Sequence, residues 1–199
     1  MIITEADLHA AVREEVDVCI IGSGAGGAMV ALALAEQGLS VVVLEEGGAY
    51  FRKDFDGRAL GAAKLMYRNQ GMDATAGIPA VIVPTGCCLG GTTVINSGTC
   101  FRAPESVLNS WKEEGLEEYG PEELAPYYER AEELMSVQPV KPEVMGRAGE
   151  IIAEGARKLG LHPNPIRRNV SDECKGCGKC VNGCTQDAKQ SMIVRVIPE

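Results

Sequence analysis

The chain has 199 residues, 45% of them hydrophobic, and a formal net charge of −9, which suits one globular domain with an appendage. The negative charge argues against nucleic acid or an anionic membrane as a partner. No run approaches the roughly 18 apolar residues of a membrane span, and residues 1–16 carry acids where a secretory signal has an apolar core, so we expect a cytoplasmic protein with no direct membrane insertion.

The N-terminal stretch differs from the glycine-rich sequence that follows it. Its pattern predicts a short amphipathic helical lead-in over residues 1–15. Four regions are expected along the chain. They are this lead-in, a nucleotide-binding βαβ core with a second glycine loop (residues 16–103), a helical insertion or cap (residues 104–165), and a Cys-rich segment with the start of a further strand (residues 166–199).

Residues 16–48 have the pattern of a strand, a glycine turn, a helix and a second strand that ends on an acid. Gly22, Gly24 and Gly27 supply the G-x-G-x-x-G spacing, which makes a tight turn, lets a pyrophosphate approach the backbone and lets helix and strand pack closely. The helix N-terminus offers free N–H groups to the phosphates. Glu45 follows about 20 residues later, where a ribose-binding acid is expected.

These features together predict an α/β chain with a Rossmann-like fold that binds FAD or NAD(P), on a parallel sheet that these residues leave incomplete. The turn alone does not separate FAD from NAD, and a glycine-rich turn in an unrelated α/β domain is the alternative. The residues predicted to hold the dinucleotide here are Gly22, Gly24, Ala25, Gly26, Gly27, Glu45 and Glu46.

Further elements follow from the apolar spacing. Helices are predicted at residues 58–67, 121–135 and 150–159, and short strands at residues 81–83 and 193–197. Pro121 suits the first turn of its helix, with acids near the positive end of the dipole. Gly38 suits the position just after the first helix.

A second glycine-rich loop spans residues 84–98 and reads Pro-Thr-Gly-Cys-Cys-Leu-Gly-Gly-Thr-Thr-Val-Ile-Asn-Ser-Gly. Its backbone N–H groups and hydroxyls can crowd a polar ligand. With the first turn, the Leu-Glu-Glu-Gly-Gly at residues 44–48 and the Leu-Ala-Pro-Tyr-Tyr-Glu-Arg-Ala-Glu at residues 124–132, this loop resembles the glucose–methanol–choline (GMC) flavin oxidoreductases. The resemblance covers most of residues 16–199 and is strongest to Cys-rich long-chain alcohol oxidases and flavin sugar dehydrogenases.

The resemblance implies an enzyme that oxidises an alcohol or sugar CH–OH group by hydride transfer to FAD. It places Gly90, Gly91, Thr92 and Asn96 near the pyrophosphate or the flavin ring. Some members of the family attach FAD covalently through a His just before the position of Asn96. This chain has Ile95 there, so we expect non-covalent FAD.

A run of four cysteines, Cys174, Cys177, Cys180 and Cys184, has C-x2-C-x2-C-x3-C spacing. This spacing is typical of iron–sulfur ligands, although Thr185 stands where ferredoxins usually carry Pro. Eight cysteines without a signal peptide indicate reduced thiols or metal ligands. Relatives of this kind use the region either for an electron-relaying cluster or only as packed thiols, so a cluster, zinc and structural thiols all stay open.

No catalytic residue can be assigned. The family's proton-abstracting His lies in its C-terminal part, and neither His9 nor His162 matches that position. We therefore expect an N-terminal fragment or one piece of a split enzyme, which needs a partner chain or a missing C-terminal half to act on a small-molecule alcohol or sugar. A non-catalytic flavin/iron–sulfur electron-transfer subunit and an NAD-dependent reductase module are the alternatives.

Overall fold

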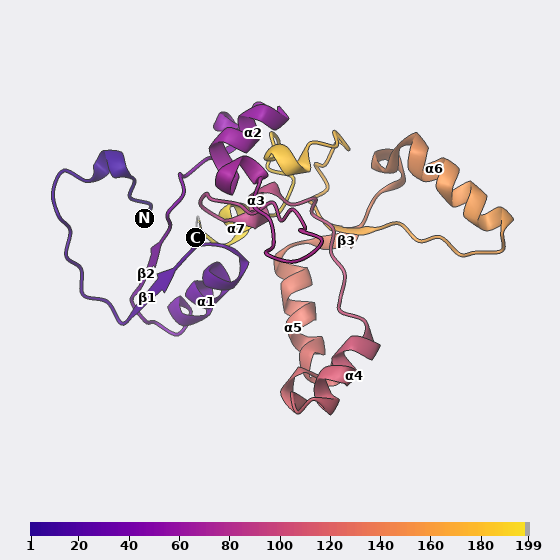
Figure 1. Cartoon of the computed structure of the whole chain (residues 1–199), viewed down its shortest axis with the longest axis horizontal. Helices are drawn as coiled ribbons and strands as arrows, with labels where there is room; N and C mark the ends of the chain where they lie inside the picture. The colour runs from indigo at the N-terminus through magenta and orange to yellow at the C-terminus, as the bar shows by residue number, and fades with distance from the viewer. Residues whose placement is uncertain (198–199) are drawn as a thin grey trace. The chain divides into compact units, whose positions relative to one another are not determined.

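The computed structural model describes residues 1–197, which divide into two compact units (Figure 1). The first unit comprises residues 1–97 together with the chain from residue 177 onward, and the second comprises residues 98–176. The cysteine run is therefore divided between them, because Cys174 belongs to the second unit and the other three cysteines to the first.

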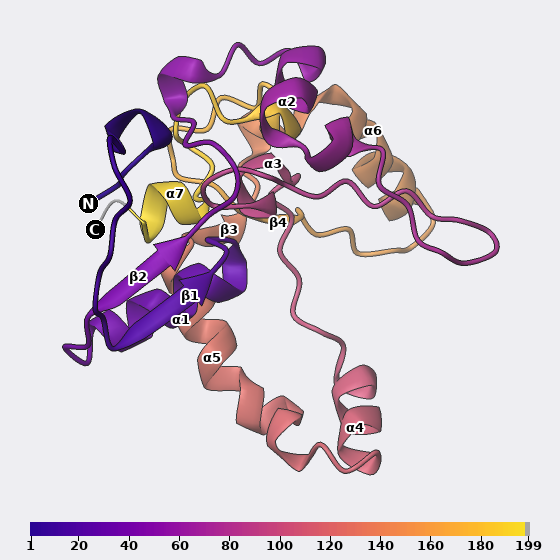
Figure 2. The same ribbon diagram turned by 60° about the vertical axis from the view of Figure 1, so that its left-hand side comes forward.

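The first unit is built on a βαβ motif, as predicted. Strand β1 (Val18–Ile21) leads into helix α1 (Ala25–Ala35), and strand β2 (Val41–Leu44) returns parallel to β1 with Val18 opposite Val41 (Figure 2). Gly38 has φ of +83° just after α1. The N–H of Gly38 donates to the carbonyl of Ala35, and that of Leu39 donates to Leu34, which is the hydrogen-bond pattern of a glycine-terminated helix.

Helix α1 packs on one face of this two-stranded sheet, and the other face is exposed. Ile20 points toward α1, since a Cβ built on Gly27 of the helix would lie 3.3 Å from its Cγ2 atom. Side chains alternate along a strand, so Cys19 and Ile21 point to the opposite face. Cys19 is exposed, Ile21 is 88% exposed and Leu44, paired with Ile21, is 54% exposed. This apolar face is uncovered within residues 1–197.

Short helices form the rest of the first unit. They are η2 (Arg52–Asp54), α2 (Ala59–Met66), η3 (Arg68–Gly71), α3 (Thr92–Ile95), η5 (Cys180–Asn182) and α7 (Met192–Arg195). Helix α2 confirms the helix expected at residues 58–67. The apolar core packs α2 and α3 against the C-terminal segment, and its buried members are Ala62, Met66, Cys88, Val94, Ile95 and Ile193.

Three predictions for this unit were wrong. Residues 1–15 hold only the short helix η1 (Glu5–Asp7), and their apolar side chains are exposed with nothing to pack against, which leaves a longer helix unsupported. Residues 81–83 make one isolated bridge, Ala74 to Ile82, instead of a strand. Residues 193–197 contain part of α7 and no strand, because burying Met192 and Ile193 in the core outweighs their β-propensity.

The second unit combines helices with a small antiparallel sheet. Its elements are α4 (Glu105–Glu113), η4 (Glu117–Tyr119), α5 (Pro121–Leu134), β3 (Val137–Pro139), α6 (Pro142–Lys158) and β4 (Arg167–Asn169). Helix α5 confirms the helix predicted at residues 121–135, with Pro121 in its first turn. The helix predicted at residues 150–159 is the C-terminal part of α6, which is interrupted at Gly146. No helix within residues 1–197 has the length and apolarity needed to cross a membrane.

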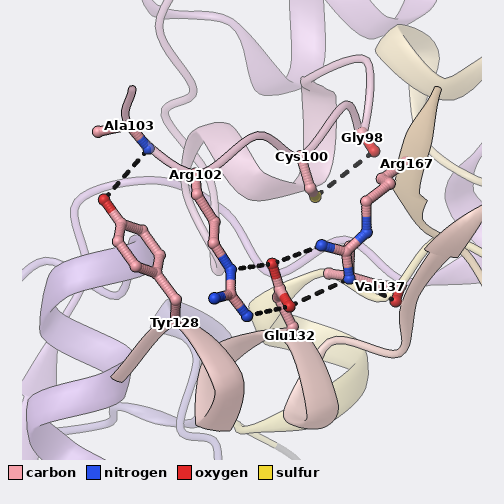
Figure 3. Close-up of polar contacts among 8 residues, drawn as sticks. All are labelled: Gly98, Cys100, Arg102, Ala103, Tyr128, Glu132, Val137 and Arg167. Carbon is pink, nitrogen blue, oxygen red and sulfur yellow. Dashed lines mark hydrogen bonds and ion pairs between the residues drawn. The ribbon is translucent and has the colours of Figure 1, made fainter. Parts of the chain in front are cut away.

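A cluster of charged side chains links helix α5 to Arg102 and to strand β4 in this unit (Figure 3). The Glu132 carboxylate accepts paired hydrogen bonds from Arg102 at 2.9 and 2.8 Å and from Arg167 of β4 at 2.8 and 3.0 Å. These bonds, with that from Arg102 the largest cause, hold the pKa of Glu132 at about 2. Arg102 also lies over the ring of Tyr128.

Candidate cofactor-binding site

In the first glycine turn, the backbone conformation at Gly22 and the close packing at Gly27 both favour glycine. Gly22 has φ of +89°, a left-handed conformation that favours glycine. A Cβ on Gly27 would lie only 2.0 Å from the carbonyl oxygen of Gly22, so the turn and the helix could not keep their close packing. The roles that the G-x-G-x-x-G spacing predicts for these two glycines therefore have a steric basis.

The N-terminus of α1 is open toward a ligand. Gly24 is its N-cap and has no side chain to cap the helix, and the first N–H with an acceptor is that of Ala28, which donates to Gly24. The N–H groups of Ala25, Gly26 and Gly27 have no hydrogen bond within residues 1–197. A Cβ built on Gly24 or Gly26 meets nothing within 4 Å, so this side of the turn is free of other protein atoms. Such a terminus suits a pyrophosphate.

The second glycine loop packs directly on the first. A Cβ on Gly91 would lie 2.9 Å from the Cα of Gly24, and the Gly90 N–H donates to the Ser23 hydroxyl at 2.9 Å. Gly47, just after β2, meets the same loop, because its Cβ would lie 2.2 Å from the carbonyl carbon of Cys87. Three segments far apart in the sequence thus meet at the N-terminus of α1.

Ser23 connects these segments, and the sequence pattern did not single it out. It is 1% exposed, and its hydroxyl donates to the Glu45 carboxylate at 2.5 Å while accepting from Gly90. Glu45 also accepts the N–H groups of Ser23 and Gly47, both at 3.0 Å. Burial alone would raise the pKa of Glu45, but these hydrogen bonds outweigh it and lower the pKa. In the sequence, only the position of Ser23 between Gly22 and Gly24 could have indicated that it belongs to the site.

The remaining predicted residues are less involved in this junction. The exposed carboxylate of Glu46 pairs with Arg68. Thr92 accepts the Gly86 N–H at 3.0 Å within its own loop. Asn96 is an exposed residue that caps the C-terminal end of α3.

The cysteines of the run that lie in the first unit do not form a metal site. Within residues 1–197, no group of three or more His, Cys, Asp or Glu side chains is placed to hold a metal ion. Cys177 is exposed, whereas the Cys184 sulfur accepts the Lys189 N–H at 3.4 Å. Cys177, Cys180 and Cys184 lie in the first unit, and there they do not form a group that could hold an iron–sulfur cluster or zinc.

Other reactive groups are also poorly placed for catalysis. Burial, the largest cause, raises the pKa of the Cys88 thiol to about 12, so it is a packed and unreactive group in the core. His9 and His162 are both exposed, and neither lies in a glycine loop.

A βαβ unit with an open helix N-terminus, crossed by a second glycine loop, defines a Rossmann-like nucleotide-binding protein. A family model for an FAD-binding domain matches residues 15–66, which include the whole βαβ unit. A second model, for GMC oxidoreductases, matches residues 63–199, more than half of the chain. The chain belongs to the GMC oxidoreductase family.

Individual relatives agree with this assignment. An uncharacterized GMC-type oxidoreductase of Mycobacterium tuberculosis is 40% identical over 200 residues, covering 100% of this chain. The long-chain-alcohol oxidase FAO3 of Arabidopsis thaliana is 34% identical over 92% of the chain. The crystal structure of pyridoxine 4-oxidase from Mesorbium loti superposes with a TM-score of 0.59 at 19% identity, over 88% of this chain and 41% of that one, which shows a shared fold.

The chain is short beside these proteins. It spans 31% of the mycobacterial relative and 24% of the Arabidopsis oxidase. The activity, substrate and partners of a whole enzyme are accordingly matters of proposal.

Proposed function

We propose that this chain is the FAD-binding portion of an oxidoreductase that oxidises an alcohol or sugar CH–OH group. The observation that carries the proposal is the junction at Ser23, where the two glycine loops and Glu45 meet beside the open N-terminus of α1. Family membership supports FAD as the dinucleotide. The name of the Arabidopsis relative supports an alcohol as substrate.

In this proposal the chain binds and orients the cofactor. The free N–H groups of Ala25, Gly26 and Gly27 hold the pyrophosphate, and Glu45 holds the adenosine ribose while it fixes the turn. Gly90 and Gly91 bring the second loop against the same cofactor. Bound FAD supplies the acceptor for the hydride that leaves the substrate carbon.

The proton acceptor is proposed to lie outside residues 1–197, in a partner chain or in a further part of the polypeptide. Removal of the hydroxyl proton needs a base within hydrogen-bond reach of the substrate. His9 and His162 are exposed and lie outside both glycine loops, so neither is assigned this role.

Titration of the purified chain with FAD and with NAD tests the cofactor directly. We expect quenching of FAD fluorescence with one site per chain and no comparable binding of NAD. Saturable binding of NAD with none of FAD would instead support a nicotinamide-dependent reductase module.

The FAD is proposed to be held without a covalent bond. The side chain of Ile95, which is 2% exposed in the core, offers no nucleophile to the flavin. Acid precipitation of the loaded protein should leave all the flavin in the supernatant. Flavin that stays with the pellet would contradict this part of the proposal.

A chimera tests the reaction class. Because identity to the mycobacterial relative is 40% over the whole chain, this sequence can replace the matching segment of that longer protein. Anaerobic addition of a long-chain primary alcohol or of glucose should bleach the bound flavin with one of the two substrates. Neither substrate bleaching a correctly loaded flavin would argue for an electron-transfer role without CH–OH oxidation.

An iron–sulfur relay is not included in the proposal. The sequence spacing favours one, but Cys177, Cys180 and Cys184 of the first unit do not form a group that could hold a metal. Iron and sulfide assays on anaerobically prepared protein test this decision, and stoichiometric amounts of both would reverse it.

A further inference from the structure

Lys189 is a buried cation in the first unit. Its side chain is among the largest that are fully buried, with the residue 2% exposed. The Nζ atom donates to the carbonyl oxygens of Val94 at 2.6 Å, Asn96 at 2.9 Å and Cys180 at 2.8 Å. An ammonium group has three N–H donors, so these three carbonyls use all of them.

Two of these carbonyls end helix α3. Val94 lies in its last turn and Asn96 is its C-cap. The last carbonyls of a helix have no partner within the helix, and a cation there satisfies them and complements the helix dipole. Lys189 therefore fixes the C-terminal end of the short helix that follows the second glycine loop.

The same C-terminal segment also contacts the beginning of this loop. The Met192 N–H donates to the Thr93 hydroxyl at 3.1 Å, and that hydroxyl donates to the Gly90 carbonyl at 2.6 Å. Residues 189–192 are thus bonded to the loop both at Thr93 and at Asn96. Gly90, which meets Ser23 of the first turn, lies within this chain of contacts.

The Cys-rich segment takes part through two backbone carbonyls and one side-chain amide. Cys180 contributes its carbonyl oxygen to Lys189, and the Val181 carbonyl accepts the Tyr67 hydroxyl at 2.8 Å. Asn182 donates its side-chain amide to the Gly57 carbonyl at 3.1 Å. None of these contacts uses a thiol.

We propose that residues 180–192 act as a brace that positions the flavin-side loop, residues 90–96, for FAD, with Lys189 as its central positioning residue. The inference rests on the proposed FAD binding and assigns the Cys-rich segment a role that needs no metal. Burying an ammonium group is costly unless its hydrogen bonds are well formed, so the site selects one geometry of the three carbonyls. A loop held in one geometry binds its ligand without an ordering cost.

The central experiment compares Lys189→Met with Cys180→Ala in the full chain. The methionine variant keeps an unbranched side chain only one atom shorter but removes all three donors, and we expect the Kd for FAD to rise about tenfold or more. The alanine variant keeps the Cys180 carbonyl and loses only the thiol, so its Kd should stay within about twofold of the wild type. A large loss of FAD with Cys180→Ala and none with Lys189→Met would overturn the brace.

A destabilised control separates positioning from general loss of stability. Ala153→Gly weakens helix α6 of the second unit, where Ala153 is buried, and alters no residue of the brace or of the loop at residues 90–96. It should lower the melting temperature but leave unchanged the visible circular dichroism of FAD bound at saturation. Lys189→Met should change that signal even at saturation, and an unchanged signal with an unchanged Kd would overturn the inference.

Tyr67→Phe provides a milder second variant if Lys189→Met fails to fold. It removes only the hydroxyl, which donates to the Val181 carbonyl at 2.8 Å and to the Ile95 carbonyl at 3.4 Å, so the loop loses its link to residues 180–192 through Tyr67. We expect faster amide hydrogen exchange at residues 90–96 and a Kd for FAD raised about two- to threefold. Unchanged exchange and Kd would overturn the brace. If the wild-type chain binds no FAD, the proposed function fails, while exchange at residues 90–96 in the Lys189 and Tyr67 variants still decides whether the brace orders the loop.

Discussion

Ser23 shows how a single small residue can connect distant parts of this site. It is fully buried between Gly22 and Gly24, and its hydroxyl both donates and accepts. A larger side chain would not fit there, and a smaller one could not link the second glycine loop to Glu45. The glycines make room for the cofactor, whereas Ser23 determines which segments surround it.

Replacement of Ser23 by Ala should weaken FAD binding about tenfold. The change leaves the buried Gly90 N–H without its acceptor and removes one donor to Glu45, a loss of about 1–3 kcal/mol. Fluorescence titration measures the effect. Ser40→Ala is the matched control, because its hydroxyl bonds Asp17 next to the start of β1. Equal affinities for both variants would contradict the role assigned to Ser23.

Gly27 and Gly26 should differ sharply when each is replaced by Ala. A Cβ at Gly27 collides with the Gly22 carbonyl, so we expect a loss of about 1–3 kcal/mol in the free energy of unfolding. A Cβ at Gly26 enters open space in a helical position, so folding stability should stay the same or rise slightly. Chemical denaturation compares the two, and similar losses would show that the turn is not close-packed.

At the scale of elements, packing decides between alternatives that residue patterns leave open. Residues 193–197 have the β-branched composition of a strand, yet their first three residues lie in α7. There the Met192 N–H donates to the Thr93 hydroxyl and Ile193 enters the core. Residues 1–15 have polar and apolar residues at helical spacing but no surface to cover, and only η1 forms. In contrast, α1 and α5 were predicted correctly, because glycine and proline mark their ends independently of context.

The link between α5 and β4 should depend on pH. Glu132 has its pKa lowered to about 2 by Arg102 and Arg167, so its contribution to stability is present above the ordinary carboxyl value and is lost as pH falls from about 4.3 through about 2. Glu132→Gln should lower the melting temperature at pH 7 by about 2–4 °C, a modest loss because the arginines are partly exposed.

The pH profile provides the stringent check on this cluster. The difference in melting temperature between Glu132→Gln and the wild type should shrink toward zero as the pH approaches 2. Glu133→Gln changes an exposed neighbour on the same helix and should match the wild type at every pH. A constant difference down to the lowest pH would mean that the charge of Glu132 is not what stabilises the unit.

At the scale of the whole molecule, the most consequential feature is that one apolar face of the β1–β2 sheet is uncovered within residues 1–197. Parallel sheets normally have both faces covered, and here α1 covers only one. Cys19, Ile21 and Leu44 leave apolar surface open within residues 1–197. This surface agrees with the proposal that further polypeptide completes the enzyme.

The isolated chain should therefore bind a hydrophobic dye and self-associate as its concentration rises. Ile21→Ser and Leu44→Ser should each reduce dye fluorescence and shift the molecular mass from light scattering toward that of the monomer. Met72→Ser, which changes a similarly exposed residue outside the sheet, is the control. A monodisperse wild-type chain that binds no dye would contradict the prediction.

The sequence by itself determined the βαβ motif, its glycine turn and the family, because these depend on local backbone conformation and on spacing along the chain. Only the tertiary structure decided that Ser23 joins the two glycine loops and that Lys189 lies buried against three carbonyls. These outcomes depend on segments about 70 to 95 residues apart coming into contact, and burial then fixes which polar groups must pair. The spacing of residues along the chain does not indicate which distant polar groups will pair. The need for glycine in a tight turn can be recognised from the sequence, because it depends on the backbone conformation of that residue alone.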